Sequence, residues 1–177
     1  VIFEAPFSLA TGGLELWLAA AGGINWGGCE VWVSTDNLNY RRVGTKYGPS
    51  RYGYTRSAMT VQPVADTTTQ LQVDLTNSAG KLISDTSPAS APRESRRTLC
   101  LVNGEFFNYR VATLTDTYQY TLSDLTRGLY NSKIVAHAAG RKFVRCDTSL
   151  FRYPFDENLI GVTLYIKLLS INLYKGA

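Results

Sequence analysis

An Asn-Gly pair at residues 103–104, with apolar runs on both sides, restricts the fold of this 177-residue chain more than any other feature. The run 99–102 precedes the pair and the run 105–111 follows it. An Asn-Gly turn of two residues requires positive φ at both positions, and it joins two antiparallel strands in a fixed register. The sequence therefore predicts a β-hairpin over residues 99–111.

Short runs of β-branched and aromatic residues, separated by Gly, Asn, Asp, Pro and Ser, continue this pattern along the chain. They predict a strand at 14–21 and a hairpin over 29–44. Further strands are expected at 57–62, 71–76, 81–84, 118–122, 142–146 and within 160–174. Helical character is confined to one or two turns near 131–139. The sequence thus predicts an all-β, mostly antiparallel fold, either a β-barrel or a β-sandwich, with at most one short helix near 131–139.

The composition, 45% hydrophobic and 18% charged, suits one ordinary core or two small ones. We expect a single β-rich domain over 1–177, with any subdomain joint at 85–97, where Ser, Pro, Ala and Arg dominate. The chain does not begin with Met, and we expect it to be a fragment of a longer chain. No apolar run approaches the roughly 18–20 residues that span a bilayer, so we expect no membrane insertion.

Charge is distributed in blocks. Residues 1–36 contain acids but no Lys or Arg, whereas 37–65 contain five bases and no acid, and 125–146 form a second acid-free block. Basic residues mixed with aromatics suit a groove for single-stranded nucleic acid, but they also suit a protein interface, which we favour. The residues that we expect at an interface or ligand contact in the first basic block are Tyr40, Arg41, Arg42, Tyr47, Arg51, Tyr52 and Tyr54.

The tryptophans Trp17, Trp26 and Trp32 have two interpretations. They can form a platform that stacks on sugar rings, or they can anchor a core or an interface. In a β-rich domain we favour the second interpretation, and we include all three among the interface or ligand-contact residues.

Motifs of catalysis are missing from the sequence. His137 is the single histidine, its neighbours are alanines, and we expect it to be structural or exposed. Glu30, Asp36 and Glu105 show no sign of facing one cleft, and residues 156–158 lack the rhythm of a calcium loop. We therefore expect no enzyme activity and no catalytic residue.

Three cysteines, Cys29, Cys100 and Cys146, have no metal-ligand spacing and cannot all pair within one chain. We interpret them as reduced thiols that serve as small core residues. No metal site and no cofactor is expected.

A series of motifs follows in a defined order. Leu-Ala-Ala-Ala-Gly stands at 18–22, Trp-Gly-Gly at 26–28, and Ser-Thr-Asp-Asn-Leu-Asn-Tyr at 34–40. Then come Asn-Gly-Glu-Phe-Phe-Asn-Tyr-Arg-Val-Ala at 103–112, Tyr-Thr-Leu-Ser-Asp-Leu-Thr-Arg-Gly at 120–128 and His-Ala-Ala-Gly-Arg-Lys-Phe-Val at 137–144. In this order they resemble the C-terminal region of the tail-hub or tail-tip proteins of siphophages and gene transfer agents. That family also carries a glycoside-hydrolase-like TIM-barrel segment. This chain departs from the family pattern at Asn37 and Leu38 and at residues 131–132.

The resemblance implies a structural virion protein at a phage tail tip or baseplate hub, which is assembled in the host bacterial cytoplasm. It would form a homotrimer, contact other tail proteins through segments such as 40–56, and act by assembly and engagement of the host surface. Nucleic acid would meet it only when the genome passes through the tail. The alternative is a carbohydrate-binding or adhesion module that binds cell-surface glycans through exposed Trp and Tyr.

Three residues in the matching motifs are expected to be structural anchors. Glu105 begins a strand directly after the Asn-Gly turn, and Arg127 precedes Gly128, which can take positive φ. We predict that Glu105 and Arg127 contact each other as a charge pair.

Overall fold

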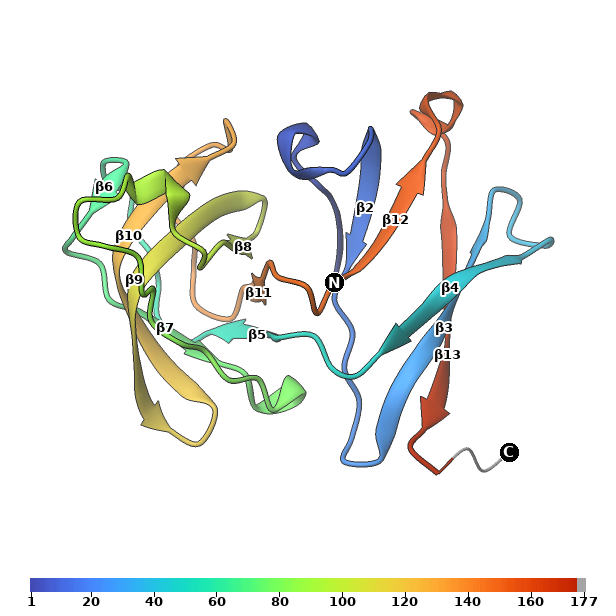
Figure 1. Cartoon of the computed structure of the whole chain (residues 1–177), viewed down its shortest axis with the longest axis horizontal. Coiled ribbons are helices and arrows are strands. Elements are labelled where there is room, and N and C mark those ends of the chain that lie inside the picture. Colours follow the sequence, from blue (N-terminus) through green and yellow to red (C-terminus); the bar gives the residue numbers. More distant parts are fainter. Residues whose placement is uncertain (175–177) are drawn as a thin grey trace. The chain divides into compact units, whose positions relative to one another are not determined.

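The computed structural model describes residues 1–174 and shows an all-β chain of antiparallel strands (Figure 1). The chain divides into two compact units. The barrel unit consists of Ser50–Asp147, and the two-sheet unit consists of Val1–Pro49 with the described residues from Thr148 onward. The chain therefore divides at 49–50 and 147–148, while the expected joint at 85–97 lies inside the barrel unit.

The barrel unit is a six-stranded antiparallel β-barrel. The strands pair in the order β10-β7-β5-β11-β8-β9, and β9 pairs with β10 to close the ring. A short strand, β6, adds to β10. The bounds are β5 (Tyr52–Thr55), β6 (Ala65–Asp66), β7 (Leu71–Asp74), β8 (Cys100–Val102), β9 (Glu105–Asp116), β10 (Gln119–Leu129) and β11 (Lys142–Arg145).

The predicted Asn-Gly hairpin forms between β8 and β9. Cys100 pairs with Phe107, and Val102 pairs with Glu105. Asn103 and Gly104 have φ angles of 48° and 86°, as this turn requires. The local sequence alone is sufficient to set this register.

Apolar side chains fill the barrel interior in the alternating pattern of half-buried strands. Leu71 and Val73 of β7 are fully buried, whereas Gln72 between them is exposed. Cys100 and Cys146 of this unit and Cys29 of the two-sheet unit are buried and form no disulfide within the described part of the chain, as expected for small core residues. The interior cluster contains Met59, Leu71, Val73, Leu75, Leu82, Cys100, Val102, Phe107, Tyr109, Tyr120, Leu122, Leu125 and Phe143.

Residues 131–139, where one short helix was allowed, contain no helix. Asn131 has a positive φ of 60°, and the one β-bridge of the segment joins His137 to Met59 through two backbone hydrogen bonds of 2.8 Å. The carbonyl of Val135 accepts a hydrogen bond from the Arg127 side chain. The backbone of the segment is thus bound to other parts of the barrel unit. The expected strands at 57–62 and 81–84 are also absent, apart from the bridge at Met59.

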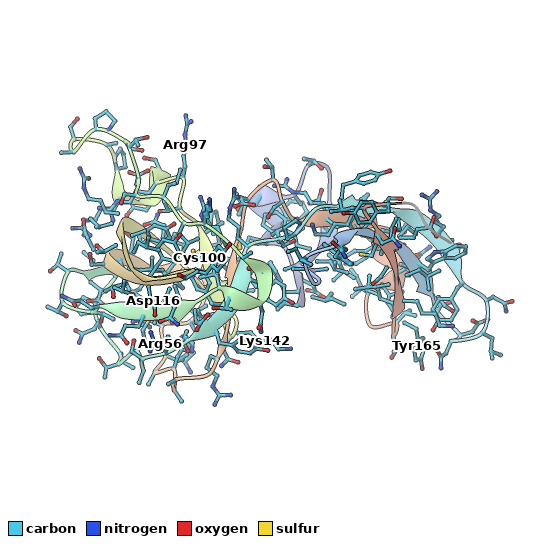
Figure 2. The ribbon with its side chains drawn as sticks, turned by 90° about the horizontal axis from the view of Figure 1, so that it is seen from below. Arg56, Arg97, Cys100, Asp116, Lys142 and Tyr165 are labelled. Carbon is cyan, nitrogen blue, oxygen red and sulfur yellow. The ribbon has the colours of Figure 1, made fainter. Side chains whose placement is uncertain are left out.

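Residues 85–97 pack on the barrel wall. The side chain of Arg96 donates to the carbonyl of Asp124 at 2.6 Å, and Arg93 forms an ion pair of 2.6 Å with the Asp124 carboxylate. Arg97 is exposed and its side chain projects away from the ribbon, whereas Cys100, three residues later, is fully buried (Figure 2). The polar composition of this segment therefore marks a surface covering of the barrel.

The two-sheet unit contains two three-stranded antiparallel sheets. The first has the order β1 (Ile2–Glu4), β2 (Leu14–Leu18) and β12 (Phe151–Phe155), and the second has the order β13 (Tyr165–Asn172), β3 (Trp26–Ser34) and β4 (Arg41–Tyr47). The hairpin predicted over 29–44 is confirmed as the pair β3–β4. Arg41 of β4 donates to the Tyr153 hydroxyl of β12 at 3.0 Å and so links the two sheets.

Four short 3-10 helices complete the elements: η1 (Phe7–Leu9), η2 (Thr76–Ser78), η3 (Arg93–Ser95) and η4 (Glu157–Leu159). Within the described residues, no helix has the length and apolar character needed to cross a lipid bilayer.

Candidate functional site

Arg127 and Glu105 form a buried, two-point ion pair in the barrel unit. Arg127 Nε donates to Glu105 Oε1 at 2.5 Å, and Nη2 donates to Oε2 at 2.8 Å. Both side chains have no exposed surface. The predicted contact between these residues is confirmed, in the parallel geometry that makes arginine–carboxylate pairs strong and directional.

Further groups complete the cluster around this pair. His137 Nε2 lies 2.8 Å from Glu105 Oε2, and Asp66 Oδ2 lies 3.7 Å from Arg127 Nη1. The Arg127 guanidinium also donates to the carbonyls of Thr60 at 3.0 Å and Val135 at 2.9 Å. The Arg127 side chain, which belongs to β10, therefore contacts β9 through Glu105, the irregular segment before β6 through Thr60, and the irregular segment after β10 through Val135.

The cluster favours ionised carboxylates. Burial raises the pKa of Glu105, but hydrogen bonds from Arg127 and His137 and the charge of Arg127 lower it by more than burial raises it, so the net shift is downward. Burial also raises the pKa of Asp66, and hydrogen bonds from Thr69 and Thr68 reverse that effect, again with a net lowering. Both acids are therefore negative at neutral pH, next to the positive Arg127.

Gly128 shapes the strand that carries Arg127. Its φ is +67°, as predicted, and a Cβ placed there would lie 2.8 Å from Ile134 Cγ1. The register between β9 and β10 shifts between Thr126 and Leu129. A bulge of this kind changes the direction of neighbouring side chains, and here it accompanies the inward position of Arg127.

The geometry of the cluster suits a structural role. Its ionisable side chains are at most 3% exposed, so a substrate in solution does not reach them. In the part of the chain that the structure describes, no group of three or more His, Cys, Asp or Glu residues is arranged to hold a metal ion. The pair satisfies the charges of Arg127 and Glu105 together with two backbone carbonyls, while Asp66 Oδ2 and His137 Nδ1 have no hydrogen-bond partner among the described residues.

The structure does not bring the three tryptophans together as an exposed platform. Trp17 lies on β2 and is 2% exposed, while Trp26 and Trp32 lie on β3, in the other sheet, and are half-buried. The indole of Trp17 donates to Glu15 at 2.8 Å. Trp17 is therefore a core anchor.

The aromatic and basic segment 40–56 contains two strands, β4 and β5, which belong to two different units. Tyr40, Arg41, Arg42 and Tyr47 lie at or beside β4, and Arg51, Tyr52 and Tyr54 lie at or beside β5. Two of these arginines are already paired: Arg42 with Glu30 at 2.9 Å, and Arg51 with Asp147 at 2.6 Å. Tyr47 and Tyr54 are 79% and 40% exposed.

Two grooves in the two-sheet unit have no signal in the sequence, because their residues come from distant segments. The apolar groove, of about 530 Å³, is lined by Ile2, Glu4, Leu14, Leu16, Phe155, Leu159, Ile160, Gly161, Val162, Leu164 and Ile166. The polar groove, of about 570 Å³, is lined by Val33, Ser34, Thr35, Asn39, Tyr40, Arg41, Tyr153, Pro154, Phe155, Asp156, Asn158, Leu159 and Leu164. Only Tyr40 and Arg41 among these residues were expected at a contact site.

No curated protein and no solved structure matches the chain. The model of one protein family, described as Rcc01698-like, C-terminal, matches residues 50–144. This range begins with the barrel unit, ends within β11, and includes Glu105, Arg127 and His137. The chain therefore belongs to the Rcc01698-like, C-terminal family.

Proposed function

We propose that this chain is a structural module of a phage tail tip or baseplate hub, and that it acts by assembly with other tail proteins in the virion. The observation that carries the proposal is the exposed apolar edge strand β13 in the two-sheet unit. The order of motifs, which resembles that of tail-hub proteins, also supports the proposal. The chain would be assembled in the host bacterial cytoplasm, as a homotrimer.

Strand β13 is the edge of its sheet, since it pairs with β3 on one side only. Neighbouring residues Leu168 and Leu169 point to opposite faces of the strand, yet they are 42% and 51% exposed. Lys167 is the one charged residue of the strand, and its ammonium lies 3.6 Å over the Tyr40 ring. Further exposed apolar residues before, on and after the strand are Ile160, Val162, Tyr165, Leu173 and Tyr174.

An edge of this kind favours pairing with another polypeptide. Soluble proteins protect long apolar edges with charges, prolines or bulges, because free backbone groups bind further strands. The occupant that fits β13 is an extended segment of a neighbouring tail protein, which would add a strand and cover the leucines. Buried interface then supplies the free energy of the assembly.

The first test is to raise antibodies against this chain and to probe purified virions from the source lysate. The proposal expects the polypeptide to sediment with the particles. Absence of the polypeptide from the particles would overturn the proposal.

The second test uses the edge itself. Leu169→Lys places a charge on β13, and we expect incorporation into particles to fall by about tenfold or more, since each charge buried at such an edge is unfavourable. The matched control is Leu114→Lys on β9, where the residue is 61% exposed and outside the two-sheet unit. Equal incorporation of both variants would contradict a role for β13.

A further inference from the structure

The polar groove gathers polar and aromatic side chains from three segments of the two-sheet unit. Tyr40 and Arg41 come from the start of β4, Tyr153 comes from β12, and Asp156 and Asn158 come from the turn after β12. The volume of about 570 Å³ lies within the range of small-molecule sites. A concave surface with a few converging polar groups is the usual form of such a site.

Several of these groups are held in place before any ligand binds. Arg41 donates to the hydroxyl of Tyr153, which is 8% exposed. The Asp156 carboxylate accepts from the backbone N–H of Asn158 at 3.0 Å. Because these contacts fix the side chains, little conformational entropy remains to be lost on binding.

The Tyr40 ring is also fixed. Its hydroxyl donates to Asn37 Oδ1 at 2.5 Å, and Lys167 covers the ring with its ammonium 3.6 Å from the centroid. Because the hydroxyl and one face of the Tyr40 ring are held in this way, the ring can present its other face to a ligand as a fixed apolar surface.

The charges and hydrogen-bonding groups that line the polar groove indicate which class of ligand it can bind. Arg41 and Asp156 carry the only formal charges among the lining residues, and these charges cancel. Beside the lining, the positive Lys167 lies over the Tyr40 ring and the negative Asp36 accepts hydrogen bonds from Asn39, so these two charges also offset each other and the groove has no net charge. It offers hydrogen-bond donors, acceptors and aromatic surface together, which match a neutral ring with many hydroxyl groups and an apolar C–H face.

From this geometry we propose that the polar groove binds a neutral saccharide, with Arg41, Tyr153 and Asp156 as its polar contacts and Tyr40 as its aromatic wall. This site differs from the tryptophan platform considered from the sequence, because none of its residues is a tryptophan. It does not depend on the proposed role in tail assembly. The adjoining apolar groove shares Phe155, Leu159 and Leu164 but has Glu4 as its one charged residue, so it serves as an internal control.

The test measures saccharide binding to the full chain by saturation-transfer NMR and titration calorimetry. The probes are N-acetylglucosamine and the methyl pyranosides of glucose, galactose, mannose and rhamnose, each at about 20 mM, a concentration at which a ligand with a Kd of about 1 mM occupies most of its sites. We expect at least one probe to bind. Absence of binding by all five probes would overturn the proposal.

Two variants then locate the site. Tyr153→Phe removes one hydroxyl and keeps the ring, and Asp156→Asn removes the charge and keeps a residue that can cap the turn. Each is expected to weaken binding by about tenfold. The control Val162→Ala, in the apolar groove, is expected to leave binding unchanged. Saccharide binding that is unchanged in both variants would overturn the assignment of the saccharide site to the polar groove. Binding of a tail-protein peptide in this groove, without binding of any saccharide, would overturn it as well.

Discussion

At the scale of single residues, one group of charged and titratable side chains in the matched family range is buried: Glu105, Arg127, His137 and Asp66. Arg127 and Glu105 have no exposed surface, and His137 is 3% exposed. A buried ion pair costs desolvation free energy that only good geometry recovers. The two-point contact and the bonds from Arg127 to two backbone carbonyls supply that geometry. These residues therefore determine how the barrel is held together.

The variant Arg127→Met tests this role. It removes the positive charge and leaves the buried Glu105 carboxylate without its main partner, so we expect a loss of about 3–5 kcal/mol of unfolding free energy. Guanidinium denaturation followed by circular dichroism measures the change. The control Arg51→Ala breaks the 2.6 Å pair with Asp147, in which the arginine side chain is 44% exposed, and should cost about 0–1 kcal/mol. Similar losses in both variants would contradict an anchoring role for Arg127.

The pH dependence of stability follows from the same cluster. The pKa values of Glu105 and Asp66 are lowered in the folded protein, so the unfolded chain binds more protons when the pH falls below the ordinary carboxyl pKa. The stabilisation is complete above about pH 5 and is lost as the pH falls through the folded pKa values. We expect denaturation midpoints to decrease between about pH 5 and pH 3, and Asp66→Asn to reduce this slope. An unchanged slope in Asp66→Asn would exclude Asp66 as a contributor.

At the scale of elements, the sequence predicts pairing between strands that are adjacent in the chain better than pairing between strands that are far apart in the chain. The hairpins β3–β4 and β8–β9 form where the sequence predicts them, because their turns and alternation are local. By contrast, β6 has two residues and pairs only with the distant β10. No local periodicity marks a strand of that length.

The bulge at Gly128 gives an element-scale prediction. Gly128→Ala introduces left-handed strain of about 1–2 kcal/mol and a contact of 2.8 Å with the Ile134 side chain. Gly104→Ala is a matched control, since Gly104 also has positive φ but a Cβ there would meet nothing within 4 Å. We expect Gly128→Ala to lower the thermal midpoint more than Gly104→Ala. The second substitution Ile134→Ala should reduce the excess, and no reduction would show that crowding is not the cause.

At the scale of the whole molecule, the family match and the candidate binding surfaces lie in different units. The matched range 50–144 falls within the barrel unit, whereas β13 and both grooves lie in the two-sheet unit. The barrel is a closed ring with a buried charged cluster, and closure leaves few free edges for partners. The open sheets carry the exposed apolar edge and the concave surfaces, which are the features that binding requires.

This division predicts that residues 50–147 fold without the rest of the chain. All six barrel strands and their partners are contained in this range. We expect a β-type circular dichroism spectrum and a cooperative thermal transition for 50–147 produced alone. A fragment of residues 1–49 should remain unfolded, because β12 and β13, the partners of β2 and β3, follow residue 148. Failure of 50–147 to show a cooperative transition would contradict the independence of the barrel.

The all-β class, the local hairpins, the burial of the cysteines and the pairing of Glu105 with Arg127 could be predicted from the amino-acid sequence alone. These features follow from turn residues, from the two-residue alternation of strands and from charges within recognisable motifs. Long-range contacts set the closure of the barrel, the division at 49–50 and 147–148, and the absence of a helix at 131–139. They also set the polar groove, in which Arg41 meets Tyr153 from 112 positions away. Such contacts depend on long-range pairing, which leaves no trace in the periodicity of a single segment.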